Sequence, residues 1–224
     1  MLLSWQPQIL VTLACAASAL QDVSKEAILS RVLAGYNKDT RPELARVQEL
    51  RYGTPGPDVI KMQMAVQNMP WIDSIKQSYL LEGYLRIWWS DYRLAYNAST
   101  SGLSAVTITS AGQLWQPDVY WEQSVEVKLG QESDGEMLRI YPDGSIFWSR
   151  QARLELRCNM GFGRLPFDVQ RCLFLAGIYS DDAANVVLKW SDETNPLGSS
   201  LPTFETVAGE WAVSEIVGSD LVDA

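Results

Sequence analysis

Apolar and polar residues alternate along much of the chain after residue 58. One run places apolar side chains at every second position, at Ile60, Met62, Met64 and Val66. A later run does the same at Leu154, Leu156 and Cys158, with charged residues between them. Successive side chains of a strand point to opposite faces of its sheet, so this period of two predicts half-buried strands.

A different period occurs earlier, between Ser24 and Tyr36. The apolar residues there follow the spacing of one face of a helix, at Ala27, Ile28, Val32 and Leu33. Ser24 can cap the first turn, and Gly35 lies where the last turn would end. The segment therefore predicts one short amphipathic helix.

Residues typical of turns separate the strand-like runs. They occur at 97–102, at Ser133-Asp134-Gly135 and at Pro142-Asp143-Gly144. Many short antiparallel strands joined by such turns are typical of a β-sandwich. We therefore predict an all-β, immunoglobulin-like sandwich of about ten strands, preceded by the short N-terminal α-helix.

The composition excludes several kinds of function. The chain has 224 residues and a net charge of −9, and its length suits one large domain. An acidic chain without clustered Lys and Arg is not typical of a nucleic-acid binder, so we expect no DNA or RNA partner. Histidine is absent, which removes Ser-His-Asp and Cys-His catalysis and the usual zinc sites. We expect no enzyme activity, no metal and no cofactor.

The N-terminus has features of a secretory signal. The apolar run from Ile9 to Leu20 contains the small residues Ala17-Ser18-Ala19, so we expect residues 1–19 to be removed. The alternative is a frayed or unstructured start, because the residues before the run include no Lys or Arg. Removal would leave two cysteines, Cys158 and Cys172, an even number that suits an oxidising compartment.

Two further features bear on the compartment. Asn97-Ala98-Ser99 is a sequon for N-glycosylation within a Ser/Thr/Gly-rich loop. No stretch after the N-terminal run approaches the roughly 20 continuous apolar residues of a membrane helix. We therefore expect a glycoprotein of the secretory pathway whose given residues do not span a bilayer.

The segment between the two cysteines carries the most specific motif. Its end reads Leu165-Pro166-Phe167-Asp168-Val169-Gln170-Arg171-Cys172. This run resembles the signature loop of the Cys-loop receptors, the pentameric neurotransmitter-gated ion channels that include nicotinic acetylcholine and GABA receptors. The resemblance implies a disulfide between Cys158 and Cys172.

Other motifs follow in the order of the family. The segment 36–42 resembles the stretch after the family's helix, the segment 89–94 its second-strand motif, and the segment 114–119 its Trp-x-Pro-Asp motif. Gly209-Glu210-Trp211 resembles the segment that leads toward the flap over the binding site. The resemblance covers residues 24–217. We expect most of these large aromatic residues to serve packing.

The resemblance implies a ligand site between neighbouring subunits. One wall would consist of strand residues, namely Tyr84, Arg86, Arg139, Phe147 and Ser149. The order Tyr84-Leu85-Arg86 resembles that of receptors for amino acids, whose carboxylate Arg86 can bind with two hydrogen bonds. Arg139 would add a second cation and so favour an anionic group.

The opposite wall would come from the next subunit. It would contain Trp121, Glu122 and Tyr179, and the Tyr179 ring can hold an ammonium group by cation–π attraction. Glu122 stands where the family usually has Tyr, so a carboxylate can pair with the amine instead. The two walls predict a small amine or amino-acid-like neurotransmitter as ligand. The alternative is that Arg86, Arg139 and Glu122 are ordinary surface charges.

The resemblance also implies roles for the remaining parts of the chain. Pro166, Phe167 and Asp168 would belong to the loop that couples ligand binding to gating. Residues 20–224 would form the ligand-binding domain, ending before the flap, the tenth strand and the membrane helices. The membrane would be reached only through a further C-terminal region.

The expected partners are identical or homologous subunits in a pentamer at the extracellular face of the plasma membrane. Two other classes stay open at this point. One is a secreted ligand-binding homologue without a channel, and the other is an unrelated secreted β-sandwich that serves as a binding module.

Overall fold

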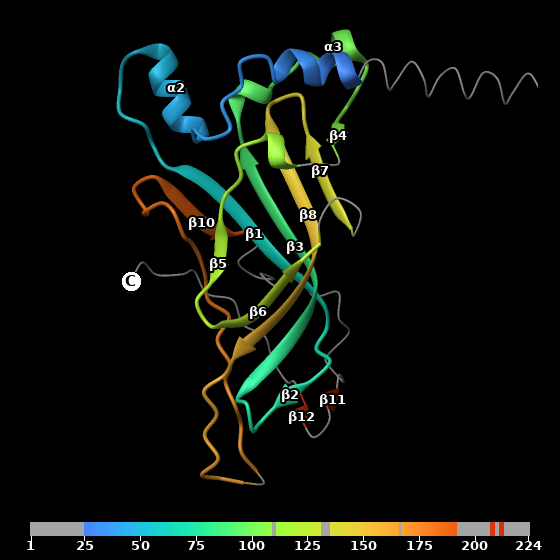
Figure 1. Cartoon of the computed structure of the whole chain (residues 1–224), viewed down its shortest axis with the longest axis vertical. Coiled ribbons are helices and arrows are strands. Elements are labelled where there is room, and N and C mark those ends of the chain that lie inside the picture. The colour runs from blue at the N-terminus through green and yellow to red at the C-terminus, as the bar shows by residue number, and fades with distance from the viewer. Residues whose placement is uncertain are drawn as a thin grey trace, which may run out of the picture.

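The computed structural model describes residues 25–108, 111–130, 135–165 and 167–191, with the backbone of two short strands at 207–208 and 211–212. The expected signal at 1–19 and the residues after 212 lie outside the described residues. The described chain is elongated, with its helices at one end and the disulfide loop at the other (Figure 1).

One large sheet of eight strands forms the main layer, in the order β10-β1-β3-β8-β7-β4, with β2 beside β3 and β6 beside β8. Its strands are β1 (Asp58–Asn68), β2 (Ile72–Asp73), β3 (Ser78–Ser90), β4 (Val106–Ile108), β6 (Ser124–Leu129), β7 (Glu136–Ile140), β8 (Ser145–Arg157) and β10 (Val186–Trp190). The pair β5 (Val119–Trp121) and β9 (Ala176–Ile178) lies in the second layer, and β11 (Val207–Ala208) pairs with β12 (Trp211–Ala212).

The predicted alternation is confirmed in the two long strands. In β1 the side chains of Ile60, Met62 and Met64 are each no more than 1% exposed, whereas Lys61 is exposed. In β8 the same holds for Leu154 and Leu156, which lie on the same side of the sheet. This side faces the hydrophobic core, and the intervening residues face outward.

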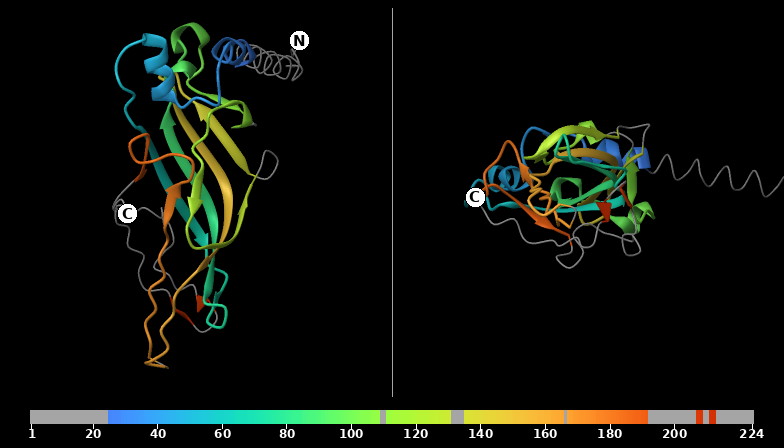
Figure 2. Two further views of the ribbon diagram at one scale, coloured as in Figure 1. Left: turned by 60° about the vertical axis from the view of Figure 1, so that its left-hand side comes forward. Right: turned by 90° about the horizontal axis from the view of Figure 1, so that it is seen from below.

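The second layer covers the core-facing side of the large sheet. Trp121 of β5 and Ala176 of β9 are buried in the same core cluster as Trp89 and Trp148 of the large sheet. The views in Figure 2 show β5 alongside the large sheet rather than within it. The prediction of a β-sandwich with about ten strands and a short N-terminal helix is confirmed.

Helices gather at one end of the sandwich (Figure 1). Residues 25–32 are helical, and the chain then turns through Gly35, so this helix ends before Tyr36. The other helices are α2 (Pro42–Leu50), α3 (Ala98–Ser101) and two short 3-10 turns, η1 (Tyr92–Leu94) and η2 (Ala111–Gln113). None of the helices in the described ranges is long and apolar enough to cross a bilayer.

Three local features differ from the sequence-based expectations. The turn expected at 97–102 is the helix α3, capped by the Asn97 side chain. Helix α2 was not predicted, because only Pro42 of its residues is buried and it therefore has no apolar stripe. Strand β10 pairs with β1 in parallel rather than antiparallel, since the chain crosses over from the second layer at β9 before it enters β10.

A buried carboxylate joins the helical end to the large sheet. Asp91, at the end of β3, is 0% exposed. Its Oδ1 accepts a hydrogen bond from Nε of Arg93 at 2.8 Å, and its Oδ2 accepts from Nη2 of Arg93 and from the Tyr36 hydroxyl, each at 2.7 Å. The Arg93 guanidinium also lies 4.3 Å from the centre of the Tyr36 ring. Burial and the neighbouring Asp91 raise the pKa of Tyr36, so its hydroxyl stays protonated and can donate.

A second buried ion pair anchors helix α2. Arg41 and Asp58 are 6% and 5% exposed, with Nη1 and Oδ2 2.9 Å apart. Arg41 also donates from Nη2 to Oδ1 of Asn185, and Asp58 accepts from the backbone N–H of Glu43. These bonds hold the start of α2, the start of β1 and the turn before β10 together.

The turn between β7 and β8 is the predicted Pro142-Asp143-Gly144. Gly144 has a φ of 82°, in the left-handed region that favours glycine. A Cβ there would also lie 2.5 Å from the carbonyl oxygen of Asp91. The hairpin therefore needs glycine at this position.

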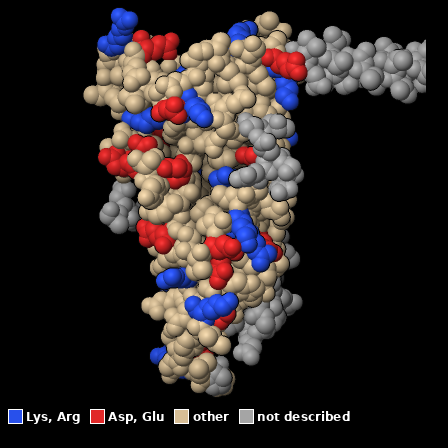
Figure 3. Space-filling model, in the orientation of Figure 1, with Lys and Arg blue, Asp and Glu red and all other residues tan. Residues whose placement is uncertain are grey.

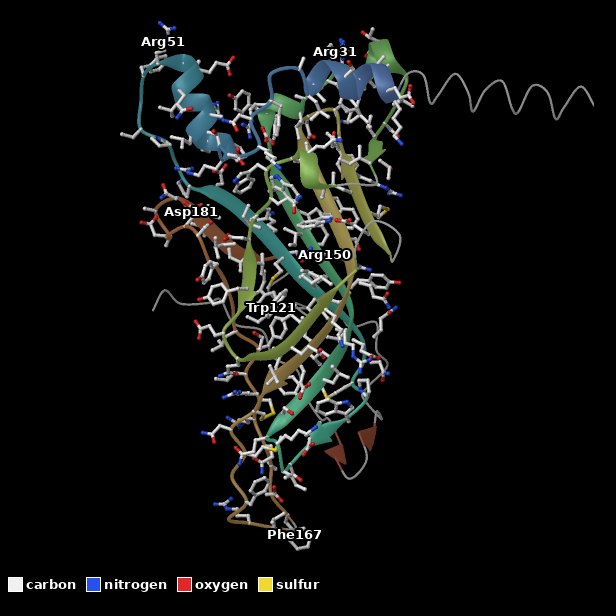
Figure 4. All side chains as sticks on the ribbon, in the orientation of Figure 1. Arg31, Arg51, Trp121, Arg150, Phe167 and Asp181 are labelled. Atoms are coloured by element: carbon white, nitrogen blue, oxygen red, sulfur yellow. A yellow bond between two sulfur atoms is a disulfide. The ribbon has the colours of Figure 1, made fainter. Side chains whose placement is uncertain are left out.

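Arg150 departs from the apolar pattern on the core-facing side of β8. Its guanidinium lies 4.0 Å from the centre of the Trp148 ring. Burial lowers the pKa of Arg150 to about 10, and its Nε has no hydrogen-bond partner among the described residues. Arg150, labelled in Figure 4, lies opposite Leu85 of β3 and Glu136 of β7 in the sheet register.

We predict that Asp91→Ala lowers the free energy of unfolding by about 3 to 5 kcal/mol, because it leaves Arg93 without its buried counter-charge. The measurement is urea unfolding of the full chain. Arg46→Ala is the control, since it removes only an exposed pair with Glu43 and should cost less than about 1 kcal/mol. If the two variants lower the free energy of unfolding by the same amount, the buried cluster does not hold the helical end.

Candidate functional site

Five of the predicted site residues lie together on the outward face of the large sheet. Arg86 of β3 is in register with Ser149 of β8, and Phe147 of β8 is in register with Arg139 of β7. Tyr84 lies two residues before Arg86 and so points to the same side. The strand order β3-β8-β7 brings these side chains into one continuous surface.

Arg86 is the cation that β3 contributes to this surface. Its Nη1 donates to Oε1 of Gln63 at 3.2 Å, across the pair β1 and β3. The described residues contain no carboxylate paired with Arg86. A half-buried guanidinium held by a neutral amide keeps donors for a carboxylate ligand.

An aromatic pair adjoins Arg86. The Trp88 and Phe147 rings have their centres 5.1 Å apart at an interplanar angle of 31°. Trp88 was not among the predicted site residues. The sequence could have indicated Trp88, because it lies two residues after Arg86 and both side chains therefore point to one face of the strand. The pair gives the surface an apolar floor beside the cation.

The second group of predicted residues lies in the other layer. The Tyr179 side chain is 80% exposed directly after β9. Its ring meets Tyr120 of β5 edge-on, with centres 5.8 Å apart and planes at 78°. Gly177 makes room for this pair, because a Cβ there would be 2.8 Å from Cε1 of Tyr120. Tyr120 is a further residue that the sequence analysis missed.

Glu122 and Trp121 take different positions in this layer. Glu122 is exposed in the turn after β5. Trp121 is only 4% exposed and belongs to the hydrophobic core. This position favours a packing role for Trp121 rather than direct contact with a ligand.

The two groups face away from each other within one chain. Tyr84 and Arg86 point away from the core, whereas β5 and β9 cover its opposite side. Tyr179 and Arg86 therefore lie on different sides of the sandwich. A single small ligand therefore cannot contact both groups within one chain.

The disulfide loop forms the end of the molecule opposite the helices. Cys158 and Cys172 are bonded, as the resemblance implied. Phe167 is 88% exposed at the tip (Figure 4), and the Asp168 carboxylate accepts from the Gln170 side chain. Pro166, the third predicted coupling residue, lies outside the described residues.

Residue Asn97 is exposed at the N-terminus of α3. Its Oδ1 accepts from the backbone N–H of Ser99 at 2.9 Å and of Thr100 at 3.3 Å. These bonds use only the oxygen of the amide, so the nitrogen that a glycan would modify is not needed for the cap. Glycosylation here stays a prediction.

The fold and its two side-chain groups define a class: a β-sandwich domain with a disulfide loop and a cationic, aromatic sheet face. The sequence profile described as neurotransmitter-gated ion-channel ligand binding domain matches residues 25–221. The chain belongs to this family. The predicted resemblance to Cys-loop receptors is thereby confirmed, and an unrelated binding module is excluded.

Curated relatives agree with the family. The chain is 26% identical over 171 residues to a gamma-aminobutyric acid receptor alpha-like protein of Drosophila melanogaster, covering 76% of this chain and 24% of the relative. It is 26% identical over 166 residues to a glutamate-gated chloride channel of the same species, covering 74% and 36%. It is 29% identical over 154 residues to the human gamma-aminobutyric acid receptor subunit rho-1, covering 66% and 31%.

These relatives are receptors and channels rather than enzymes, in agreement with the expectation that this chain is not an enzyme. The chain spans about a quarter to a third of their lengths.

We predict that the chain carries a glycan at Asn97 when it is secreted from a eukaryotic cell, seen as a mobility shift that an endoglycosidase removes. Asn97→Asp should abolish the shift but keep the cap, because Asp also accepts from backbone N–H groups. Asn97→Ala should abolish both and lower the free energy of unfolding by about 1 kcal/mol. A wild-type chain without the shift would contradict the prediction.

Proposed function

We propose that this chain is the extracellular ligand-binding domain of a pentameric ligand-gated ion-channel subunit. Its ligand is a small neurotransmitter with a carboxylate and an amine, bound between subunits. The observation that carries the proposal is the placement of Arg86, Ser149 and the Trp88–Phe147 pair on the outward sheet face. The chain's second layer would present Tyr179 and Glu122 to the next subunit.

Each wall suits one end of such a ligand. Arg86 can bind the carboxylate with two parallel hydrogen bonds, and Ser149 beside it can donate a third. The exposed Tyr179 ring and the Glu122 carboxylate favour an ammonium group. Two relatives are named for gamma-aminobutyric acid and for glutamate, and both of these compounds carry a carboxylate and an amine.

The exposed end of the domain supports a role in coupling. Phe167 and Val169 are 88% and 83% exposed in the disulfide loop, and Ile75 is 94% exposed in the β2–β3 turn. The backbone N–H of Cys158 donates to the carbonyl oxygen of Gln77, which joins this turn to the start of the loop. Large apolar side chains gathered at one end mark a docking surface. We propose that the membrane part of the subunit docks there and receives the signal.

The alternative is a secreted homologue that binds the ligand without a channel. Both possibilities use the same walls, so a test of the ligand site applies to each. The two possibilities differ in the partner of the apolar end, which is the membrane part only in a channel subunit.

We predict saturable binding of gamma-aminobutyric acid or glutamate to the full chain at concentrations where it is assembled, measured by calorimetry. Arg86→Ala should weaken this binding at least about thirtyfold, because loss of one partner of a desolvated charge pair costs 2 kcal/mol or more. Arg153→Ala is the matched control, since Arg153 lies on the neighbouring strand and pairs with Glu82 at the exposed surface. Absence of saturable binding, or equal effects of the two variants, would refute the proposed ligand site.

We also predict that the double variant Phe167→Ser, Val169→Ser binds less of a dye that fluoresces on apolar surfaces. Val59→Ser, at a position 46% exposed at the start of β1, should leave dye binding nearly unchanged, because it lies near the helical end of the domain. If both variants bind as much dye as the wild-type chain, the disulfide loop is not the docking surface.

A further inference from the structure

A hollow of about 360 Å³ lies at the end of the large sheet that carries the disulfide, where β3 begins and β8 ends. The polar residues that line it are Lys76, Gln77, Ser78, Glu155, Arg157 and Asn159. These include two cations and one carboxylate, so positive charge is in excess. The hollow is separate from the proposed amino-acid site, because Ser149 and Arg157 are about 26 Å apart along β8.

Two paired strands form one wall of the hollow. Ser78 and Arg157 are direct partners in the register of β3 and β8. Glu155 lies two residues before Arg157 and so points to the same side of the sheet. The Ser78 side chain is 1% exposed, and its hydroxyl donates to Oε1 of Glu155 at 3.1 Å. This bond fixes the carboxylate, which has no ion-pair partner among the described residues.

The two cations of the hollow are free to turn toward a ligand. Arg157 is exposed and has no ion-pair partner within the ranges that the structure describes. Lys76 is 69% exposed, and its Nζ lies 3.6 Å from Oδ2 of Asp73, which is longer than a close charged hydrogen bond. The side-chain amides of Gln77 and Asn159 add further donors.

Backbone contacts hold the two rims of the hollow together. The carbonyl oxygen of Gln77, next to Lys76, accepts from the backbone N–H of Cys158 at 2.7 Å. Cys158, next to Asn159, is 2% exposed and bonded to Cys172. The β2–β3 turn and the start of the disulfide loop are therefore joined without a ligand, so the hollow is preformed.

We propose that this hollow binds a phosphate ester that also carries an ammonium group, the chemistry of phosphorylethanolamine. Arg157 donates two parallel hydrogen bonds to the phosphate oxygens, and Lys76 adds a second positive charge. Glu155 binds the ammonium group through the oxygen that Ser78 does not occupy. Inorganic phosphate would leave Glu155 facing an anion, so the carboxylate selects for the ester.

The charge of the whole chain makes such a local set of contacts necessary. The net charge is −9, and the face in Figure 3 mixes basic and acidic side chains. Long-range attraction therefore does not draw an anion to the surface. The contacts within the hollow supply the affinity.

Two sources offer this chemistry, a free ester and the headgroup of phosphatidylethanolamine. The hollow suits either source, because Ile75 beside Lys76 is 94% exposed at the apolar end of the domain. The experiment therefore needs one arm for each source.

Calorimetry of the full chain with phosphorylethanolamine, inorganic phosphate and ethanolamine tests the proposal. We expect phosphorylethanolamine to bind at least about tenfold more tightly than the other two compounds, because only it contacts both Arg157 and Glu155. Arg157→Gln should weaken its binding about tenfold or more. Arg153→Gln is the matched control and should bind like the wild-type chain, since Arg153 lies on the same face of β8 and pairs with Glu82.

Glu155→Gln separates the effects of the two charges. Glutamine keeps an acceptor for the Ser78 hydroxyl but removes the negative charge. Inorganic phosphate should then bind more tightly, and phosphorylethanolamine should lose its advantage over it.

Vesicles of equal parts phosphatidylcholine and phosphatidylethanolamine distinguish the sources. Sedimentation of the chain with these vesicles, lost in Arg157→Gln but not in Arg153→Gln, would assign the hollow to a lipid headgroup. Binding of the free ester without vesicle binding would assign it to a soluble ligand.

Three results would overturn the inference, with circular dichroism verifying that each variant is folded. These are absence of saturable phosphorylethanolamine binding, equal affinity of the wild-type chain for inorganic phosphate, and equal effects of Arg157→Gln and Arg153→Gln. The amino-acid site is tested separately, because Arg86→Ala leaves this hollow intact. Failure of the amino acids to bind would contradict only the proposed function.

Discussion

The bonds between Asp91, Arg93 and Tyr36 connect the helical end of the domain to its largest sheet. A fully buried carboxylate is tolerated only when its charge is matched and its oxygens accept hydrogen bonds. Here Arg93 supplies the charge and Tyr36 supplies a further donor. Tyr36 in turn accepts from the backbone N–H of Trp115 at 3.1 Å, so one cluster ties three separate segments together.

This cluster lies at the end of β3, and the register of that strand determines which residues face outward. A slip of one residue would exchange the two faces of a strand. It would move Arg86 into the core and Ile87 to the surface. The long pairing of β3 with β8, from Ser78 opposite Arg157 to Ser90 opposite Ser145, holds the same register over the whole face. The position of the candidate ligand site thus depends on the pairing of β3 with β8, and the Asp91 cluster joins the end of that pair to the helices.

The sequence predicted the features that depend on local period or on family motifs. The alternation at Ile60 and Met62, the disulfide of Cys158 and the hairpin at Gly144 belong to this group. The sequence did not predict the features that depend on pairing between strands far apart along the chain. The parallel pair of β1 and β10 and the place of Trp88 beside Phe147 follow from sheet order, which no single segment encodes. Helix α2 was missed because polar anchors at Arg41 and Asp58, rather than an apolar stripe, hold it in place.

Charged side chains have different surroundings in the interior and on the surface of this domain. In the interior, Asp91 and Asp58 have ion-pair partners, and Arg150 lies against the Trp148 ring, with Glu136 opposite it in the register of β7 and β8. On the surface of the large sheet, Arg153 pairs with Glu82 and Lys128 with Glu126, whereas Lys61, Arg139 and Lys189 have no ion-pair partner among the described residues. Exposed charges of either kind contribute little to the stability of the chain, because water and salt screen them. The buried pairs therefore stabilise the fold, and the unpaired cations of the outward face are left for the proposed carboxylate ligand.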